Sequence, residues 1–329
     1  MRRTFSAVML FFLVFCSAQA QQKTFFITGR AQGTTYQIQY LADREVVRKS
    51  SIDSVMGVID QSMSLYQPHS LISMFNRQYH HELEIDTHMA NVLREAFQVY
   101  EKSNGLFDVT VKPLVDLWGF GSEGVQLFPP QATVDSVLSF VGMEKIWLEG
   151  NQLHKRDPRT AIDLNGIAQG YTVDVLSQWL DERIIDSYLV EVGGEIRTKG
   201  LKAEGKSYEI AIERPEGAQS SSFVLQLTDL AVTTSGNYRK VAYHEGKKVH
   251  HHIDPKSGFP LQNIVVSATI IAPTAMEADA YDNVFMALSP QAGIALANRL
   301  AGIEVYIIYE GHGAFHEAYS DGFLSFVKP

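Results

Sequence analysis

Frequent turn signals divide the second half of the chain into short runs of β-forming residues. Such runs occupy residues 145–156, 187–200, 208–215, 221–236 and 237–253, and the last reads as a hairpin that turns at Glu245-Gly246-Lys247. Helical patterns interrupt these runs only at 166–183, 276–288 and 291–300. Strands that follow one another through turns favour antiparallel pairing, whereas a doubly wound fold requires strict strand-helix alternation. The sequence therefore predicts an α+β fold with largely antiparallel sheets and packed helices.

The first half of the chain carries helical periodicity. Apolar residues recur at helical spacing in two segments, at Ile52, Val55, Ile59 and Met63, and at Val92, Leu93, Ala96 and Tyr100. Both segments are predicted to be amphipathic helices. No linker-like stretch divides the chain after its first residues, so we expect residues 21–329 to form a single domain.

The N-terminus has the three parts of a secretory signal peptide. Arg2 and Arg3 precede an apolar run from Val8 to Phe15, and Ala18-Gln19-Ala20 follows as a small-x-small cleavage signal. The apolar run is too short for a membrane span, and no other window reaches the roughly twenty apolar residues that such a span needs. We expect residues 1–20 to be removed and the mature protein to be periplasmic.

The single cysteine and the net charge exclude several classes of protein. Cys16 stands alone, so no disulfide forms, and the bulky Phe15 before it argues against a lipoprotein signal. Without the two arginines, 26 basic residues face 37 acidic ones, and the formal charge moves from -9 to -11. An acidic chain without a basic block does not suit nucleic-acid binding, which depends on phosphate neutralisation.

Two segments combine carboxylates with predicted helix starts. In AIDLNGIAQGYTVD, an apolar strand is expected to end at Asp163 and a helix to begin near Gly166, which would place free backbone N–H groups beside a carboxylate. In APTAMEADAYDNVFMALS, Thr274 and Glu277 have capping-box spacing. Taken alone, a helix cap at Asp163 is the commoner arrangement.

The second of these helices carries oxygen side chains at helical spacing. Asp279 and Asn283 lie one turn apart on one face, with Asp282 beside them. Oxygen ligands one turn apart suit Mg²⁺, which completes its shell with water and phosphate. An exposed acidic face is the commoner explanation of such a pattern.

Two further segments hold aromatic residues and histidines. In NGLFDVTVKPLVDLWGFG, glycines and Pro113 bracket Phe107, Trp118 and Phe120, as in a wall of a planar-ligand pocket, although such residues are more often core. In HHHIDPKSGFP, adjacent strand residues point to opposite faces, so the three histidines do not suit one zinc ion.

Together these segments resemble the ApbE family of FAD:protein FMN transferases. The segments in question are GTTY, SLYQPHSLISMFN, FDVTVKPLVDLWGFG, IDLNGIAQGYTVD, VGGEI, TTSGNY, HHIDPKSGFP and ADAYDN, which stand here in the family's order. Each is weak alone, but the ordered set is specific. The resemblance implies an ApbE-like fold and transfer of FMN from FAD onto a Thr or Ser hydroxyl of a target protein, with release of AMP.

The resemblance also implies roles for particular residues. In the family, the functional histidine stands three residues before the aspartate of the HHIDPKSGFP segment, and this spacing selects His251. The histidines on either side of His251 are expected to be strand-surface residues. Mg²⁺ is expected at the Gly166 carbonyl, Asp279 and Asn283, and the catalytic pair is His251 with Asp279. Residues expected to bind FAD are Gln32, Tyr66, Trp118, Gly119, Phe120, Asp163, Gln169 and His251.

The chain departs from the family pattern at two of these positions. Gln169 stands where the family commonly has lysine, and Asn283 where it usually has threonine. An amide oxygen can still coordinate a hard cation, so a metal site of altered strength is expected. The loss of a fixed positive charge near a pyrophosphate should weaken FAD binding or slow charge neutralisation.

Three activities are therefore compatible with the sequence. The first is FMN transfer to an acceptor protein, expected to be an extracytoplasmic subunit of a redox complex. The second is Mg²⁺-dependent FAD pyrophosphatase activity, which uses water as acceptor and gives FMN and AMP. The third is non-catalytic periplasmic FAD binding.

Overall fold

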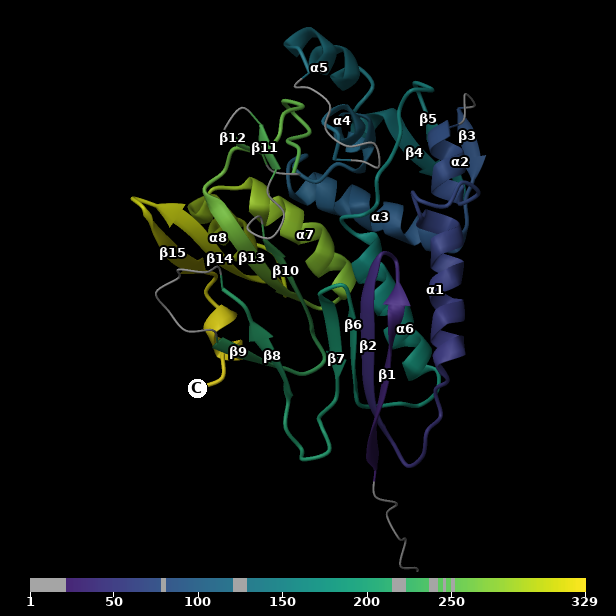
Figure 1. Ribbon diagram of the computed structural model, residues 1–329, viewed down its shortest axis with the longest axis vertical. Helices are drawn as coiled ribbons and strands as arrows, with labels where there is room; N and C mark the ends of the chain where they lie inside the picture. Colours follow the sequence, from purple (N-terminus) through teal and green to yellow (C-terminus); the bar gives the residue numbers. More distant parts are fainter. Residues whose placement is uncertain are drawn as a thin grey trace, which may run out of the picture.

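An eight-stranded antiparallel sheet forms the centre of the molecule in the computed structural model (Figure 1). The structure describes residues 22–77, 81–120, 129–214, 223–236, 242–244, 247–249 and 252–329. The strand order is β1-β2-β6-β7-β10-β13-β14-β15. These strands are β1 (Lys23–Ala31), β2 (Thr34–Ala42), β6 (Tyr188–Val192), β7 (Glu195–Lys199), β10 (Ala231–Gly236), β13 (Val265–Ala272), β14 (Glu304–Gly311) and β15 (Ala314–Tyr319).

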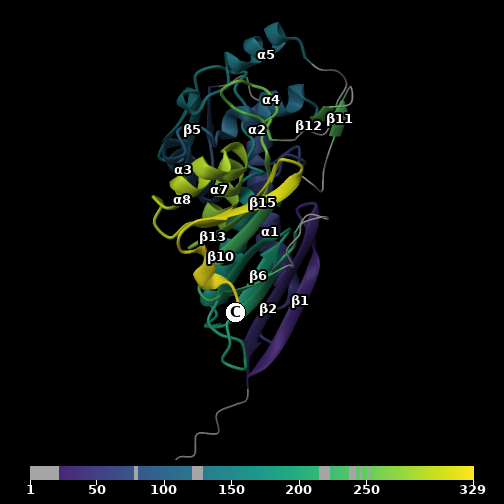
Figure 2. The same cartoon turned by 90° about the vertical axis from the view of Figure 1, so that its left-hand side faces the viewer.

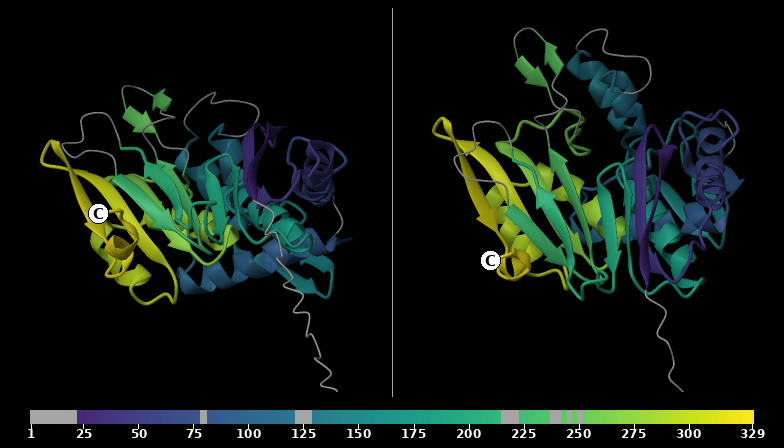
Figure 3. Two further views of the ribbon diagram at one scale, coloured as in Figure 1. Left: turned by 90° about the horizontal axis from the view of Figure 1, so that it is seen from below. Right: turned by 60° about the horizontal axis from the view of Figure 1, so that its bottom comes forward.

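Helices cover one face of this sheet. They are α1 (Lys49–Met63), α3 (Thr87–Lys102), α6 (Ala168–Asp181), α7 (Ala275–Ala287) and α8 (Pro290–Ala297). α6 packs on β6 and β7, and α7 packs on β10 and β13. The views in Figure 3 show the sheet and these helices as two layers. All eight side chains of β13 are buried, because this strand lies between its neighbours in the middle of the molecule.

The other face is covered in part by a hairpin and the C-terminal segment. The hairpin consists of β8 (Tyr208–Ile212) and β9 (Phe223–Leu227), and the C-terminal turn is η3 (Phe323–Phe326). Tyr306 of β14 stacks on Phe323, with ring centroids 5.5 Å apart. This layer buries a separate apolar cluster on the side away from the helices.

Shorter elements gather at one end of the sheet, at the top of Figures 1 and 2. They are α2 (Leu71–Arg77), η1 (Val109–Val111), α4 (Lys112–Leu117), α5 (Gln131–Leu138), η2 (Met143–Lys145), a three-stranded sheet of β3 (Glu82–Glu84), β5 (Gln152–Lys155) and β4 (Ile146–Glu149), and the hairpin of β11 (Ala242–His244) and β12 (Lys247–Val249). Among the described residues, no helix is both long and apolar enough to cross a membrane.

The predicted fold class is confirmed, since every pairing between described strands is antiparallel. The predicted helices and the hairpin at 242–249 are present. One local prediction is wrong: residues 160–164 form an extended segment outside any strand. The sequence pattern also missed β1, β2, β14 and β15.

Candidate functional site

Helices α6 and α7 cap each other, and this places Asp279 at the N-terminus of α6. The backbone N–H of Gly170 donates to Asp279 Oδ2 at 2.8 Å. In return, Asp174 of α6 accepts from the backbone N–H groups of Ala275 and Met276, at 3.0 and 2.9 Å. A Cβ atom at position 170 would lie 2.2 Å from the Ala275 carbonyl oxygen, so only glycine permits this close approach. The predicted capping box at Thr274 and Glu277 is formed in part: Thr274 Oγ1 accepts from the N–H of Glu277 at 3.2 Å, and the same hydroxyl donates to the Glu277 carboxylate at 3.1 Å.

Asp279 belongs to a buried group of carboxylates. Asp282 and Glu195 are also buried, and Glu195 is the first residue of β7. Burial raises the pKa of Asp279 well above its usual range, and the carboxylate of Asp282 raises it further. The pKa values of Asp282 and Glu195 are raised by burial and by the other members of the group. The acidic residues of α7 are therefore buried and do not form the exposed acidic face that is the commoner explanation of this pattern.

One oxygen of this group lacks a hydrogen bond. Glu195 Oε2 is buried and has no partner among the described atoms. Burying a carboxyl oxygen without a hydrogen-bond partner is costly unless a ligand supplies one. The group therefore has the properties of a site that binds a cation or a hydrogen-bond donor.

Asp163 is held in place by contacts on both sides of its extended segment. Asn76 donates to the Ile162 carbonyl and accepts from its N–H, at 2.8 and 2.7 Å, so its amide acts as a strand partner. The N–H of Asp163 donates to the Val109 carbonyl at 2.7 Å, and Asp163 Oδ1 accepts from the N–H of Asn165 at 2.8 Å. Burial raises the pKa of Asp163.

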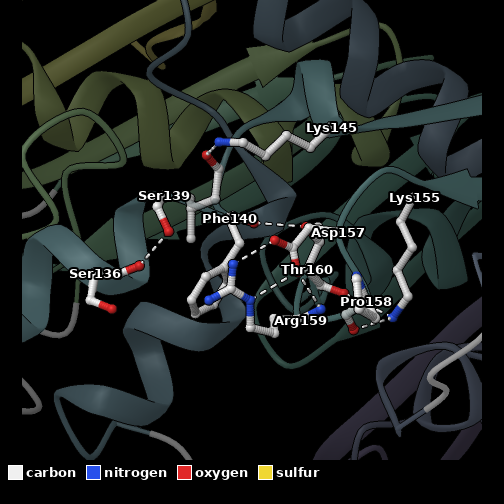
Figure 4. A network of polar contacts seen from close by, with 10 residues as sticks. Ser136, Ser139, Phe140, Lys145, Lys155, Asp157, Pro158, Arg159 and Thr160 are labelled. Carbon is white, nitrogen blue, oxygen red and sulfur yellow. Dashed lines mark hydrogen bonds and ion pairs between the residues drawn. The ribbon is translucent and has the colours of Figure 1, made fainter.

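The residues that lead into this segment form a polar network (Figure 4). Arg159 forks onto Asp157 and stacks over the ring of Phe140, with 4.5 Å from its Cζ to the ring centroid. Thr160 Oγ1 donates to the Phe140 carbonyl at 2.8 Å. Buried Lys155 donates to the carbonyl of Pro158 at 3.0 Å. The network fixes the chain before it reaches Asp163.

Gln32 stands in a tight turn between β1 and β2. Gln32 and Gly33 both have positive φ angles, 52° and 74°, as a two-residue hairpin turn requires. The Gln32 amide donates to Thr172 Oγ1 of α6 at 3.1 Å. This contact fixes the turn against the start of α6.

The loop at 252–261 forms the predicted turn. Asp254 accepts from the N–H of Lys256 and from Ser257 Oγ, at 3.0 and 2.7 Å, and the Gly258 N–H donates to the Asp254 carbonyl at 2.8 Å. Trp118 Nε1 donates to the Gly258 carbonyl at 2.7 Å. Trp118 is therefore buried against this loop, and it is not among the residues that line the cavity described next.

A cavity of about 1250 Å³ joins these parts. The predicted FAD and metal residues on its wall are Gln32, Tyr66, Gly119, Phe120, Asp163, Gly166, Gln169, Asp279 and Asn283. Tyr66 is 79% exposed, so its ring is free to stack on a planar ligand. His251 and His250 lie outside the described residues. His252 lines the cavity, so the expectation that both neighbours of His251 are surface residues is wrong for His252.

The structure adds residues that the sequence did not single out. Glu195 and Lys112 line the cavity, and Asp174 and Asn76 hold its walls. Glu195 lies in VGGEI and Asn76 in SMFN, so the family segments contain both residues, but the sequence did not indicate what either residue does. Only the folded arrangement shows that Asp174 caps a helix that begins a hundred residues later.

The predicted metal ligands are brought together and suit a hard cation. Asn283 Nδ2 lies 3.5 Å from the Gly166 carbonyl oxygen and 2.7 Å from Asp282 Oδ1. The amide nitrogen therefore faces these oxygens, and coordination of a cation by oxygens of Gly166, Asp279 and Asn283 would require the amide to turn over and give up its contact with Asp282. Within the described part of the chain, no group of three or more His, Cys, Asp or Glu residues has metal-binding geometry. The predicted set differs in kind, since it contains one carboxylate, one amide and one carbonyl.

Comparison with known proteins gives a consistent result. The model of the ApbE family matches residues 32–307. The chain is 35% identical over 327 residues to the FAD:protein FMN transferase of Vibrio cholerae, with 97% of each chain covered. It is 33% identical over 330 residues to the FAD:protein FMN transferase of Haemophilus influenzae, with 96% of this chain and 95% of the relative covered.

Solved structures show the same similarity. The flavin transferase ApbE from Vibrio cholerae superposes with a TM-score of 0.85 at 33% identity, covering 93% of this chain and 99% of the other. The apo form of the Pseudomonas stutzeri flavinyl transferase ApbE gives a TM-score of 0.86 at 28% identity, with 93% and 97% covered.

Proposed function

Because the chain belongs to the ApbE family and is an FAD:protein FMN transferase, we propose that it modifies a Thr or Ser hydroxyl in a Mg²⁺-dependent reaction. The hydroxyl oxygen attacks the phosphorus of the FMN half of FAD. A P–O bond to the acceptor forms, the phosphoanhydride bond breaks, and AMP leaves. The observation that carries this proposal is the buried carboxylate Asp279 on the wall of a cavity large enough for a dinucleotide.

The walls of the cavity provide for FAD. Tyr66 and Phe120 offer aromatic faces for a ring system, and Gln32 and Gln169 offer amides for polar edges or phosphates. Trp118 supports this wall from behind through its contact with Gly258. Asp163 lies on the same wall, fixed by Asn76 and Val109.

The Gly166 carbonyl, Asp279 and Asn283 would hold the Mg²⁺ ion. When bound, the ion would neutralise charge on the pyrophosphate oxygens and on the AMP leaving group. The protein's own contribution here is positional. The N–H of Gly170 fixes the Asp279 carboxylate, and α6 is in turn anchored to α7 through Asp174.

We assign proton removal from the acceptor hydroxyl to His251. The assignment follows the family pattern, in which the functional histidine stands three residues before Asp254, and the Asp254 turn holds the loop that follows this histidine. Replacing His251 by Ala should lower the transfer rate roughly 10²–10⁴-fold at saturating FAD and Mg²⁺, as expected for loss of a general base. Replacing His250 by Ala is the matched control and should cost little. Equal losses in both variants would contradict the assignment.

The N-terminal segment indicates where the reaction takes place. We propose that residues 1–20 direct export and that the mature enzyme modifies an extracytoplasmic subunit of a redox complex. N-terminal sequencing of the exported protein should begin directly after Ala20. A protein that begins at an acylated Cys16 would overturn this proposal.

One incubation tests the reaction itself. The mature protein is mixed with FAD, Mg²⁺ and a candidate acceptor domain, and the intact mass of the acceptor is followed together with free nucleotides. Transfer predicts that the acceptor gains the mass of FMN while an equal amount of AMP appears. Release of FMN and AMP without acceptor labelling would indicate a pyrophosphatase, and unchanged bound FAD would indicate a binding protein.

A further inference from the structure

Strand β10 extends beyond its neighbour on one side. It pairs with β13 along its whole length, from Ala231 to Gly236. On the other side it pairs with β7 only at Ala231 and Val232, among the described residues. The β6–β7 hairpin turns back at Gly193-Gly194, two glycines with positive φ angles. One backbone edge of Thr233–Gly236 is therefore left without a neighbouring strand in the described sheet (Figure 1).

This edge lies inside the functional site. Ser235 lines the cavity, as do Gly193 and Glu195 of the shorter hairpin and Gln32 to Thr34 of the β1–β2 turn. We call the space between Thr233–Gly236 of β10 and the β1–β2 turn the notch. It is part of the cavity whose wall also carries Glu195, Asp279 and Asp282. The outer edges of the sheet, on β1 and β15, lie at the two ends of the strand order.

The floor of the notch has an unused hydrogen-bond acceptor. Glu195 is buried, and it lines the cavity together with Gly193 of the hairpin turn. Its Oε2 atom, however, has no partner among the described residues. A donor that enters the notch would satisfy this atom, and both a hydroxyl and a backbone N–H qualify.

The cavity is also larger than a pocket for one drug-sized molecule. Its volume of about 1250 Å³ exceeds the 300–1,000 Å³ typical of pockets for one small molecule. The transfer reaction needs such room, because a protein segment must reach the same phosphorus as the bound FAD. A free strand edge recognises an extended segment through main-chain hydrogen bonds, without a demand for particular side chains.

From these observations we infer that the acceptor segment binds as an added strand on the Thr233–Gly236 edge of β10. Its hydroxyl-bearing residue then lies in the notch beside Glu195, on the side of the cavity that holds Asp279. This inference rests on the proposed function and names how its protein substrate is held. Glu195 acts as a positioning residue for the incoming donor.

The first test uses the acceptor domain that gains FMN in the incubation described above, and a synthetic peptide of its segment around the modified hydroxyl. A single N-methyl group is placed at successive peptide positions. Strand pairing directs every second N–H toward β10, so kcat/KM for the peptide should fall about ten-fold or more at alternate positions. The KM for FAD should stay unchanged. Losses without a two-residue period would overturn the inference.

Hydrogen exchange gives an independent second test. The acceptor domain with Val in place of its modified Thr, or Ala in place of a modified Ser, binds without reacting. At concentrations that saturate turnover of the parent domain, amides in Thr233–Gly236 should gain protection. The matched controls are β1 and β15, whose edges should not change. Protection at β1 or β15 instead, or none at β10, would overturn the inference while the labelling assay still supports transfer. An enzyme that labels no acceptor would overturn the proposed function and the inference with it.

Discussion

Two buried charged sites in this protein differ in how their hydrogen bonds are satisfied. Lys155 is fully buried, and its ammonium donates to the carbonyls of Phe75, Pro158 and Thr160, at 3.0, 3.0 and 3.1 Å. An ammonium has three donors, so the protein satisfies all of them. The Lys155 site therefore ties β5, α2 and the segment before Asp163 together without any ligand.

The carboxylates Glu195, Asp279 and Asp282 show the opposite arrangement. They are buried together and raise one another's pKa, and Glu195 Oε2 has no hydrogen-bond partner among the described residues. The described protein groups do not complete this site. The comparison teaches that a buried charge can be a structural tie, as at Lys155, whereas the carboxylate group has an oxygen that a ligand can still satisfy.

The largest effect is expected from removing the charge at Asp279. Asp279→Asn keeps an oxygen for the Gly170 N–H but loses the negative charge, so FMN transfer should fall about a thousand-fold. The melting temperature in EDTA should not fall, since the variant also removes repulsion from Asp282. Adding Mg²⁺ should raise the melting temperature of the parent and not that of the variant.

Asp116→Asn is the matched control for Asp279→Asn. Asp116 also lines the cavity, but it is exposed and paired with Lys112. Its transfer rate and its response to Mg²⁺ should remain close to those of the parent. If Asp279→Asn transferred FMN at the parent rate under limiting Mg²⁺, the assigned site would be wrong.

A smaller effect, on stability, is expected at Lys155. Lys155→Met keeps the apolar stem but leaves three buried carbonyls without a donor, so the free energy of unfolding should fall by about 3 kcal/mol. Lys145→Met is the control, because Lys145 is part of the same region but donates to one carbonyl, that of Val141, and pairs with the exposed carboxylate of Glu144. Urea denaturation measures both. Equal losses would show that the Lys155 contacts are not exceptional.

The pH dependence of stability sharpens the same contrast. Burial lowers the pKa of Lys155 to about 8, from 10.5. Between these values the unfolded chain binds the proton and the folded chain does not, so this group's contribution to stability rises with pH. The stability difference between the parent and Lys155→Met should therefore grow from pH 8 to pH 10, by up to about 1.4 kcal/mol per unit. Urea titrations of both proteins at pH 7.5, 8.5 and 9.5 measure this difference. A stability difference that does not change with pH would contradict the prediction.

The smallest effect is expected at Asn283. Asn283→Thr restores the residue that the family usually carries and should retain or raise transfer, within a few-fold of the parent rate. Asn283→Ala should lose activity, but less completely than Asp279→Ala, because a carboxylate contributes charge as well as an oxygen. Rates measured over a series of Mg²⁺ concentrations distinguish a weaker metal site from a slower reaction. A severe loss in Asn283→Thr would indicate that the amide has a role that threonine does not share.

Local pattern was sufficient for much of the fold. The α+β class, the central helices, the capping box at Thr274 and the turn at Asp254 follow from spacing and turn chemistry that act within a few residues. The family segments also identified most of the cavity wall. Nine of the predicted FAD and metal residues lie on it.

The remaining features depend on contacts between distant parts of the chain. Residues 160–164 are extended without being a strand, because the Asn76 amide and the Val109 carbonyl supply their partners. Trp118 carries the same pocket signal as Phe120, yet it packs on Gly258 while Phe120 lines the cavity. Nothing in the local sequence distinguishes these outcomes.

The sequence by itself determined the type of fold, the family and the order of the functional segments, because these follow from short-range periodicity and specific motifs. Only the tertiary structure decided that Asp279, Asp282 and Glu195 are buried together and that β10 extends past β7. Burial and unpaired edges arise from the packing of α6 on α7 and from the length of the β6–β7 hairpin. They depend on which elements become neighbours in the fold, and the sequence of a single strand or helix does not specify its neighbours.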